Sequence, residues 1–211
     1  MSRRHLFATV LCLGLGIAPV VQAWENEIFS LRNRWENITT AMDETRRADA
    51  LSSLAEEAGA LAEANPDTSE VLVWQGIILA SLAREVGGLD ALGPAKEARR
   101  VLERAIEIDP EGYHGSAYVT LGALYDRAPG WPVAFGDDDT AERMFQRALE
   151  IRPTGIDVQY YYAAFLADEG RDDEALEHAR RAMEGQAREG RQASDEVLRR
   201  RAKDMIERLE D

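Results

Sequence analysis

YVTLGALYDR, residues 118–127, followed by AERMFQRALEIRP, residues 141–153, is the stretch of sequence that decides the fold. The first segment places Tyr, Leu-Gly and Tyr at intervals of three and four residues, and the second places Ala, Phe and Ala in the same way. Both spacings are those of one face of an α-helix. Pro153 closes the unit, because proline cannot continue a helix. The stretch therefore predicts two antiparallel helices that pack by these faces.

The same arrangement recurs along the chain. Prolines at 66, 110 and 153 close successive units and lie about 43 residues apart. The pattern is that of the tetratricopeptide (TPR) repeat, whose plain unit is about 34 residues long. We therefore predict an all-α, TPR-like superhelix of antiparallel helix pairs, with three to four repeats lengthened by insertions and a C-terminal capping helix. Repeats of this kind build binding surfaces, which favours an interaction protein over an enzyme.

Two insertions account for the extra length. Residues 127–138 contain two prolines and two glycines, which rule out a continuous helix. Asp139, with a glutamate three residues later, has the spacing of a capping box and predicts that the second helix restarts there. In the preceding unit, Gly87-Gly88 is expected to end the first helix and Gly93-Pro94 to begin the second.

The pattern divides the chain into four parts. They are an export signal (1–23), N-terminal helices with a degenerate first repeat (24–66), TPR-like repeats (67–185) and a capping helix (186–211). The helix that follows the signal is expected to bury Phe29, Leu31, Trp35 and Ile38 on its apolar face. Ser194-Asp195 is expected to cap the last helix at its N-terminus.

The N-terminus has the features of a secretory signal. Arg3 and Arg4 precede an apolar run that ends in small residues, and cleavage is expected after Ala23. An uncleaved anchor and export by the twin-arginine route are the alternatives. The mature protein is expected to be periplasmic and, because Cys12 leaves with the signal, to contain no disulfide.

Composition excludes several classes of function. The formal net charge of −14 disfavours nucleic acid and anionic membrane surfaces as partners. Neither His114 nor His178 has a recognisable nucleophile or carboxylate arrangement beside it, and no phosphate-binding loop or metal-binding spacing is present. We therefore expect no catalytic residues, no metal and no cofactor.

One candidate site is the concave groove of the superhelix. The groove-facing positions lie one and five residues after the start of each first-helix motif. They are Val73, Ile77, Val119, Ala123, Tyr160 and Ala164. This lining is small and apolar and lacks the Lys, Arg and Asn that clamp a carboxylate. It predicts an apolar ligand or a helix as the occupant. Alternatively, the C-terminal helix of the chain itself fills the groove.

The other candidate site is the loop between Pro129 and Gly136. It holds Trp131 and Phe135 among prolines and glycines, and rigid aromatic side chains of this kind serve as anchors in recognition. Alternatively, both aromatic side chains are buried between repeats.

These residues carry a resemblance to a known family. The motifs Ala128-Pro129-Gly130-Trp131-Pro132 and Phe135-Gly136-Asp137, set within a TPR unit of an exported chain, resemble the T-component (TatT) family of TRAP transporters. The resemblance covers about residues 72–182. It implies a periplasmic helical-repeat protein that partners a TRAP solute-binding protein, self-associates around an apolar pore and helps to deliver organic ligands.

Three hypotheses follow for the function. The first is an exported scaffold for protein–protein interaction that partners the solute-binding protein of a TRAP transporter. The second is a periplasmic carrier of an apolar small ligand, and the third is a general adaptor in assembly of the cell envelope. A homo-oligomer is compatible with each of them.

Overall fold

The structure is a computed structural model that describes residues 21–210, with side chains from Trp24 onward. The expected export signal at residues 1–23 therefore lies almost entirely outside the described residues. The described part contains nine α-helices and one short 3-10 helix, η1. They are α1 (Val21–Thr40), α2 (Glu44–Ala64), α3 (Ser69–Val86), η1 (Gly88–Ala91), α4 (Leu92–Ile108), α5 (Ser116–Arg127), α6 (Asp138–Ile151), α7 (Ile156–Asp168), α8 (Asp172–Glu184) and α9 (Gln192–Glu210).

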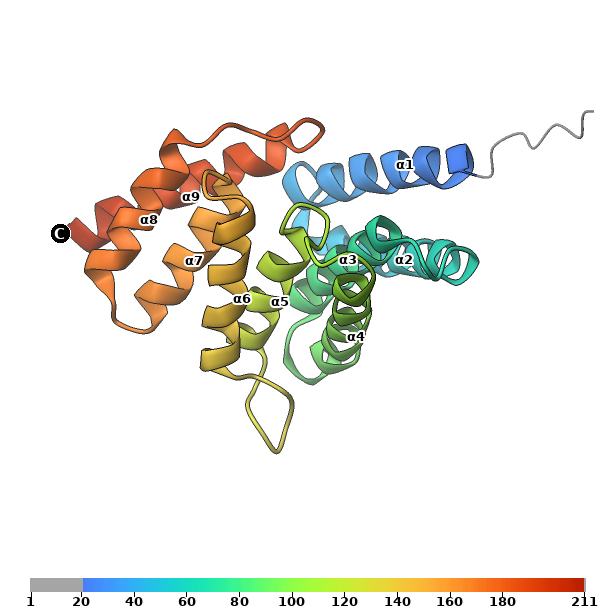
Figure 1. Cartoon of the computed structure of the whole chain (residues 1–211), viewed down its shortest axis with the longest axis horizontal. Coiled ribbons are helices and arrows are strands. Elements are labelled where there is room, and N and C mark those ends of the chain that lie inside the picture. Colours follow the sequence, from blue (N-terminus) through green and yellow to red (C-terminus); the bar gives the residue numbers. More distant parts are fainter. Residues whose placement is uncertain (1–20, 211) are drawn as a thin grey trace, which may run out of the picture.

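The helices pack as consecutive antiparallel pairs. Figure 1 shows α1 with α2, α3 with α4, α5 with α6 and α7 with α8 following one another around a curved stack, and α9 lies against the last pair. The first helix of each pair faces the inside of the curve, and α9 contacts both α7 and α8. This confirms the predicted TPR-like superhelix with its capping helix.

Small residues allow the two helices of a pair to approach closely. A Cβ atom added at Gly122 of α5 would lie 2.7 Å from the ring of Phe145 in α6. A Cβ atom at Gly76 of α3 would lie 2.4 Å from Leu102 of α4. Glycine at these positions therefore lets a large side chain of the partner helix pack directly on the backbone, and the Leu-Gly element of the motif follows from this contact.

The structure corrects three details of the sequence prediction. Phe29 is 57% exposed, and Ile28 takes the buried position on α1, because a stripe with Leu31 and Trp35 requires spacings of three and four residues. The cap of α6 is Asp137 and not Asp139, since the Asp137 carboxylate accepts a 2.8 Å hydrogen bond from the Thr140 N–H.

The third correction concerns the start of α9. This helix begins at Gln192, so Ser194 and Asp195 lie in its first turn and not before it. The Asp195 carboxylate instead accepts a 2.8 Å hydrogen bond from the backbone N–H of Arg188 in the preceding connection. Through this first turn, α9 also reaches the opposite end of the stack: the Ser194 N–H donates to the Glu36 carboxylate of α1 at 2.9 Å. The curved stack is therefore closed by contact between its first and last helices.

Candidate functional site: the inner cavity and the Trp131 loop

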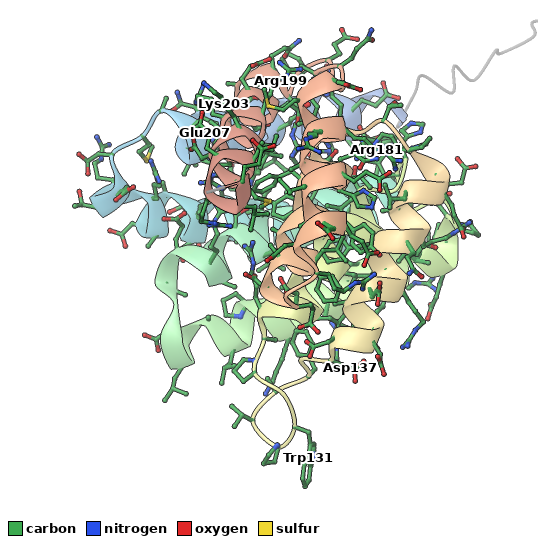
Figure 2. All side chains as sticks on the ribbon, turned by 90° about the vertical axis from the view of Figure 1, so that its left-hand side faces the viewer. Trp131, Asp137, Arg181, Arg199, Lys203 and Glu207 are labelled. Carbon is green, nitrogen blue, oxygen red and sulfur yellow. The ribbon has the colours of Figure 1, made fainter. Side chains whose placement is uncertain are left out.

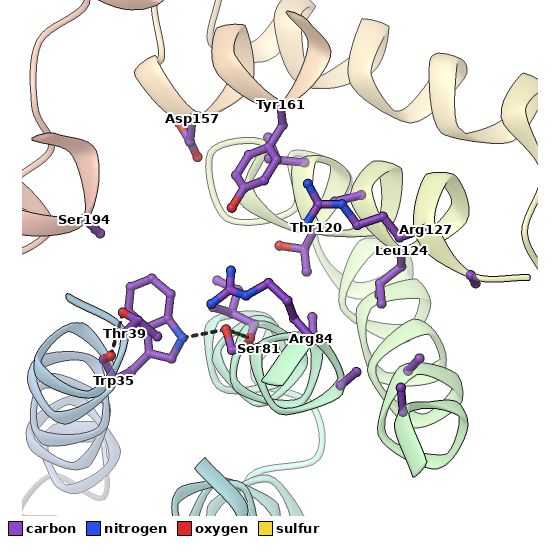
Figure 3. Close-up of a pocket in the computed structure, with 18 of the residues that line it drawn as sticks. Trp35, Thr39, Ser81, Arg84, Thr120, Leu124, Arg127, Asp157, Tyr161 and Ser194 are labelled. Atoms are coloured by element: carbon purple, nitrogen blue, oxygen red, sulfur yellow. Dashed lines mark hydrogen bonds between the residues drawn. The ribbon is translucent and has the colours of Figure 1, made fainter. Parts of the chain in front are cut away.

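A cavity of about 600 Å³ lies on the inner face of the superhelix, and we call it the inner cavity. Figure 3 shows side chains of α1, α3, α5, α7 and α9 converging on it. The residues that define it include Trp35, Thr39, Ile77, Ser81, Arg84, Val119, Thr120, Ala123, Leu124, Arg127, Asp157, Tyr161, Arg191, Ser194 and Val197. The concave face is thus hollow between α3 and α5. The insertion at residues 87–94, at the junction of α3 and α4, lengthens the repeat at this place.

The predicted groove residues fall into three groups. Ile77, Val119 and Ala123 line the inner cavity, as their register in the repeat predicts. Val73 is fully buried in the core between the helices and does not line the cavity, so its predicted position in the groove is wrong. Tyr160 and Ala164 pack in one cluster with α9, which contributes Met205 and Ile206. The C-terminal helix therefore fills the groove over α7 and leaves it open over α3 and α5.

The lining of the inner cavity is not purely apolar, in contrast to the sequence prediction. Arg84 of α3 and Arg127 of α5 point into it in Figure 3. The Arg127 guanidinium lies over the ring of Tyr161, 5.7 Å from its centre. Both arginines lie on the same helix faces as predicted groove residues, Arg84 seven positions after Ile77 and Arg127 four positions after Ala123. Extending the helical register by one or two turns would have found them.

Arg191 lies at the inner end of the cavity, between two tryptophans. Its guanidinium is 4.4 Å from the ring centre of Trp35 and 5.2 Å from that of Trp74. Trp35 is held in place by a 2.8 Å hydrogen bond from its indole N–H to the Ser81 hydroxyl. Burial, followed by the nearby positive charge of Arg188, lowers the pKa of Arg191 to about 10. No repeat position predicts Arg191, because it belongs to the connection between α8 and α9.

A buried cluster of charges stands next to Arg191. The Arg188 guanidinium donates to Asp157 at 2.7 Å and to Asp195 at 2.5 Å, and Arg152 donates to Asp157 at 2.7 Å. Burial alone would raise the pKa of Asp157, but the charges of Arg188 and Arg152 outweigh it and hold this pKa below its ordinary value. The cluster joins α7, α9 and the connection between α8 and α9, so it fixes the position of Arg191 at the cavity wall.

The loop between α5 and α6 presents one aromatic side chain and buries part of the other. Trp131 is 90% exposed and projects from the tip of the loop (Figure 2). Phe135 packs edge-on against Tyr125, with ring centres 5.4 Å apart, and lies under the Arg99 guanidinium at 4.6 Å. The alternative that both side chains are buried therefore fails for Trp131, and the role of the two residues as recognition anchors stays a prediction.

The base of this loop is tightly held. The Gly136 N–H donates to the Pro129 carbonyl at 2.9 Å, and the Asp137 N–H donates to the Tyr125 carbonyl at 3.1 Å. A Cβ atom at Gly136 would lie 1.9 Å from the Ala128 carbonyl oxygen, so only glycine fits there. Pro129 and Val133 of the same loop line the inner cavity, which places Trp131 beside its mouth.

Two other kinds of site are missing from the described part of the chain. Residues 21–210 contain no group of three or more His, Cys, Asp or Glu side chains that could hold a metal ion. Within the same residues, no helix combines the length and apolar character that crossing a membrane requires.

Comparison with known proteins identifies the family and supports the fold. A family model described as "TRAP transporter T-component" matches residues 30–211. No curated protein is significantly similar in sequence. A thermophilic TPR protein from Thermus thermophilus is similar in structure, with a TM-score of 0.58, 20% identity, and coverage of 76% of this chain and 78% of that chain. The solved structure of MamA gives a TM-score of 0.48 at 17% identity, and the match covers 80% of this chain and 93% of that one.

Proposed function

Because the chain belongs to the TRAP transporter T-component family, we propose that it is a periplasmic scaffold that docks with the solute-binding protein of a TRAP transporter. The observation that carries the proposal is the exposed Trp131 on a rigid loop beside the mouth of the inner cavity. A partner that covers this loop would also cover the cavity. A non-catalytic role fits the interaction surfaces that TPR-like helices build.

Three features favour the Trp131 loop as the docking surface. Tryptophan is enriched among the residues that dominate binding energy at interfaces. Phe135 and the hydrogen bonds at the loop base hold the loop in one conformation, which reduces the entropy lost on binding. Leu89 and Val133 are 81% and 51% exposed and line the same cavity, so they extend the apolar surface around its mouth.

Replacing Trp131 with alanine tests this proposal. We expect affinity for the solute-binding protein of the same organism to fall about 30-fold or more, as for a binding hot spot. The free energy of unfolding should change by less than about 0.5 kcal/mol, because the side chain makes few contacts within the protein. Calorimetric titration of the two purified proteins measures the first effect, and urea denaturation measures the second.

The matched control is Phe29→Ala, which removes another exposed aromatic side chain, on α1. Phe29→Ala should bind the solute-binding protein as tightly as the wild type. Equal affinity of Trp131→Ala and the wild type would rule out the loop as the docking surface. No detectable complex with the wild-type protein would rule out the partner.

A second proposed role, compatible with the first, is that the inner cavity carries a small organic ligand. The apolar surface of Ile77, Val119 and Ala123 would take an apolar body, and Arg84 and Arg127 would take an anionic group at one end. The ligand class favoured by this lining is thus an organic acid with an apolar body, and not a purely apolar molecule.

Filling the inner cavity tests the carrier role. Gently purified wild-type protein should show an added ligand mass by native mass spectrometry, and Ala123→Phe should lose it because the larger side chain occupies the cavity. Ala60→Phe is the control, since Ala60 is exposed on α2 outside the cavity. Wild-type protein without an added mass in repeated preparations would contradict the carrier role and leave the docking proposal intact.

A further inference from the structure

A second cavity adjoins the inner cavity and shares Ser116, Arg188 and Arg191 with it. Its volume is about 610 Å³, and it lies among the connections that join successive helix pairs. We call it the basic cavity because five arginines line it. They are Arg32, Arg147, Arg152, Arg188 and Arg191. Three glutamates also line it, and all three are exposed: Glu111, Glu150 and Glu189.

Several buried N–H groups at the basic cavity lack a hydrogen-bond acceptor. Among the described residues, the Nε atoms of Arg32 and Arg152 and the indole Nε1 atom of Trp74 are buried and make no hydrogen bond. Trp74 is only 1% exposed. The Tyr113 hydroxyl lies near the Trp74 indole. Burial raises the pKa of Tyr113, and the neighbouring indole lowers it to a smaller extent. The geometry between the two groups is nevertheless not that of a hydrogen bond, so the Trp74 N–H has no acceptor.

These unpaired groups determine what could satisfy them. Guanidinium and indole nitrogens only donate hydrogen bonds, so each requires an acceptor. Buried polar groups in proteins are paired with a partner in the large majority of cases. Three donors without acceptors beside one cavity therefore indicate a ligand rich in acceptor atoms.

The charges around the basic cavity indicate that this ligand is an anion. Arg188 and Arg152 are neutralised by buried carboxylates, and Arg147 pairs with Glu150 at 2.6 Å. By contrast, Arg32 and Arg191 form no ion pair within residues 21–210, and the only carboxylates whose charges act on Arg191, those of Asp157 and Asp195, are already paired with Arg188. Arg32 lies over the ring of Phe29 at 5.2 Å, and Arg191 lies over two tryptophans. An aromatic ring attracts a cation but carries no compensating charge.

We propose that the basic cavity binds a small oxyanion, such as inorganic phosphate, sulfate or a short carboxylate. Arg32, Arg152 and the Trp74 indole N–H would donate to its oxygens once the side chains that cover these nitrogen atoms shift aside, and Arg191 would supply a further positive charge. Arginine suits this role because its donors form a planar fork that matches two oxygens of one anion. The site is separate from the surface proposed for the solute-binding protein, and its test requires no partner protein.

Titration with inorganic anions tests the proposal. Calorimetry at constant ionic strength, with chloride as the reference anion, should show saturable binding of phosphate or sulfate to the wild-type protein. Arg32→Gln should weaken this binding about tenfold or more, because a charge-assisted hydrogen bond is lost. Arg34→Gln is the control: Arg34 lies on the same helix, is exposed and pairs with Glu57. An acetate titration distinguishes a carboxylate site from one that requires a tetrahedral anion.

A spectroscopic measurement locates the anion without any change at an arginine. The chain has four tryptophans, so the indole N–H region of a proton–nitrogen correlation spectrum is simple, and Trp74→Phe assigns the Trp74 signal. Phosphate should shift the Trp74 signal and leave that of Trp131 unchanged. The proposal is overturned if phosphate, sulfate and acetate all bind no more tightly than chloride, if Arg32→Gln binds the anion as the wild type does, or if the bound anion leaves the Trp74 signal unmoved.

Discussion

Replacing Asp157 with asparagine is expected to lower the free energy of unfolding by about 3–5 kcal/mol at neutral pH, as measured by urea denaturation. The reason is burial. Asp157 is 5% exposed and accepts hydrogen bonds from both Arg152 and Arg188, which would be left with too little negative charge around them. Removing one partner of a buried ion pair leaves an uncompensated charge in a medium of low polarity.

The control is a salt bridge of nearly the same length on the surface. Arg100 and Glu97 are 2.6 Å apart, against 2.7 Å for Arg188 and Asp157, but the Glu97 side chain is 41% exposed and that of Asp157 only 6%. Glu97→Gln should therefore cost no more than about 1 kcal/mol. Equal effects of the two substitutions would show that burial of the cluster does not contribute to stability.

The effect of Asp157→Asn should also depend on pH. Because the folded protein holds the pKa of Asp157 below the unfolded value of about 3.9, the stabilisation is complete above that value and is lost as the pH falls through the folded pKa. The stabilities of the variant and the wild type should therefore converge below about pH 4. A difference that stays constant down to pH 3 would contradict this assignment.

Replacing Phe145 with alanine should lower the free energy of unfolding by about 3–5 kcal/mol, the usual range for a buried phenyl ring. Phe145 is fully buried, rests on Gly122 and packs against Tyr162 and Phe165, with ring centres 5.8 Å and 5.7 Å away. The loss would leave a cavity at the junction of two helix pairs. Urea denaturation measures the effect, and Gln146→Ala, at the exposed neighbouring position, is the control.

A second substitution distinguishes the packing contact from a general loss of apolar surface. Gly122→Ala alone should cost about 1–3 kcal/mol, because its Cβ atom would overlap the Phe145 ring. Combined with Phe145→Leu, which removes the overlapping ring atoms, it should cost less than the sum of the two single changes. Strict additivity of the two changes would show that the contact between Gly122 and Phe145 does not limit packing here.

The sequence predicted the helix pairs because their determinants are local. Small residues at helical spacing, such as Ala141 and Ala148 beside Phe145, specify which faces meet whatever the rest of the chain does. The same register placed Ile77, Val119 and Ala123 at the inner cavity. The register was wrong at Val73, which lies too deep between the helices of its pair. The predicted apolar face of α1 was wrong at Phe29, because the buried stripe runs through Ile28.

The rest of the site could not be predicted because it depends on contacts between distant segments. Arg191 lies in a connection with no periodic pattern, and its position follows from α1, α3 and α9 coming together. The partial burial of Phe135 likewise depends on Tyr125 and Arg99, which belong to different helices. The loop sequence alone does not distinguish the exposed aromatic residue from the partly buried one.

The contact between the ends of the stack has a consequence for how the protein reaches its native state. Glu36 and Ser194 are 158 positions apart, so their hydrogen bond cannot form until almost the whole chain has been synthesised. Until α9 is in place, Tyr160 and Ala164 lack part of their apolar covering and Arg188 lacks Asp195. Contacts of such long range form slowly, since the entropy of closing a long loop must be overcome first. We therefore expect completion of both cavities to be a late step in folding, and the incomplete chain to expose apolar surface that favours aggregation until then.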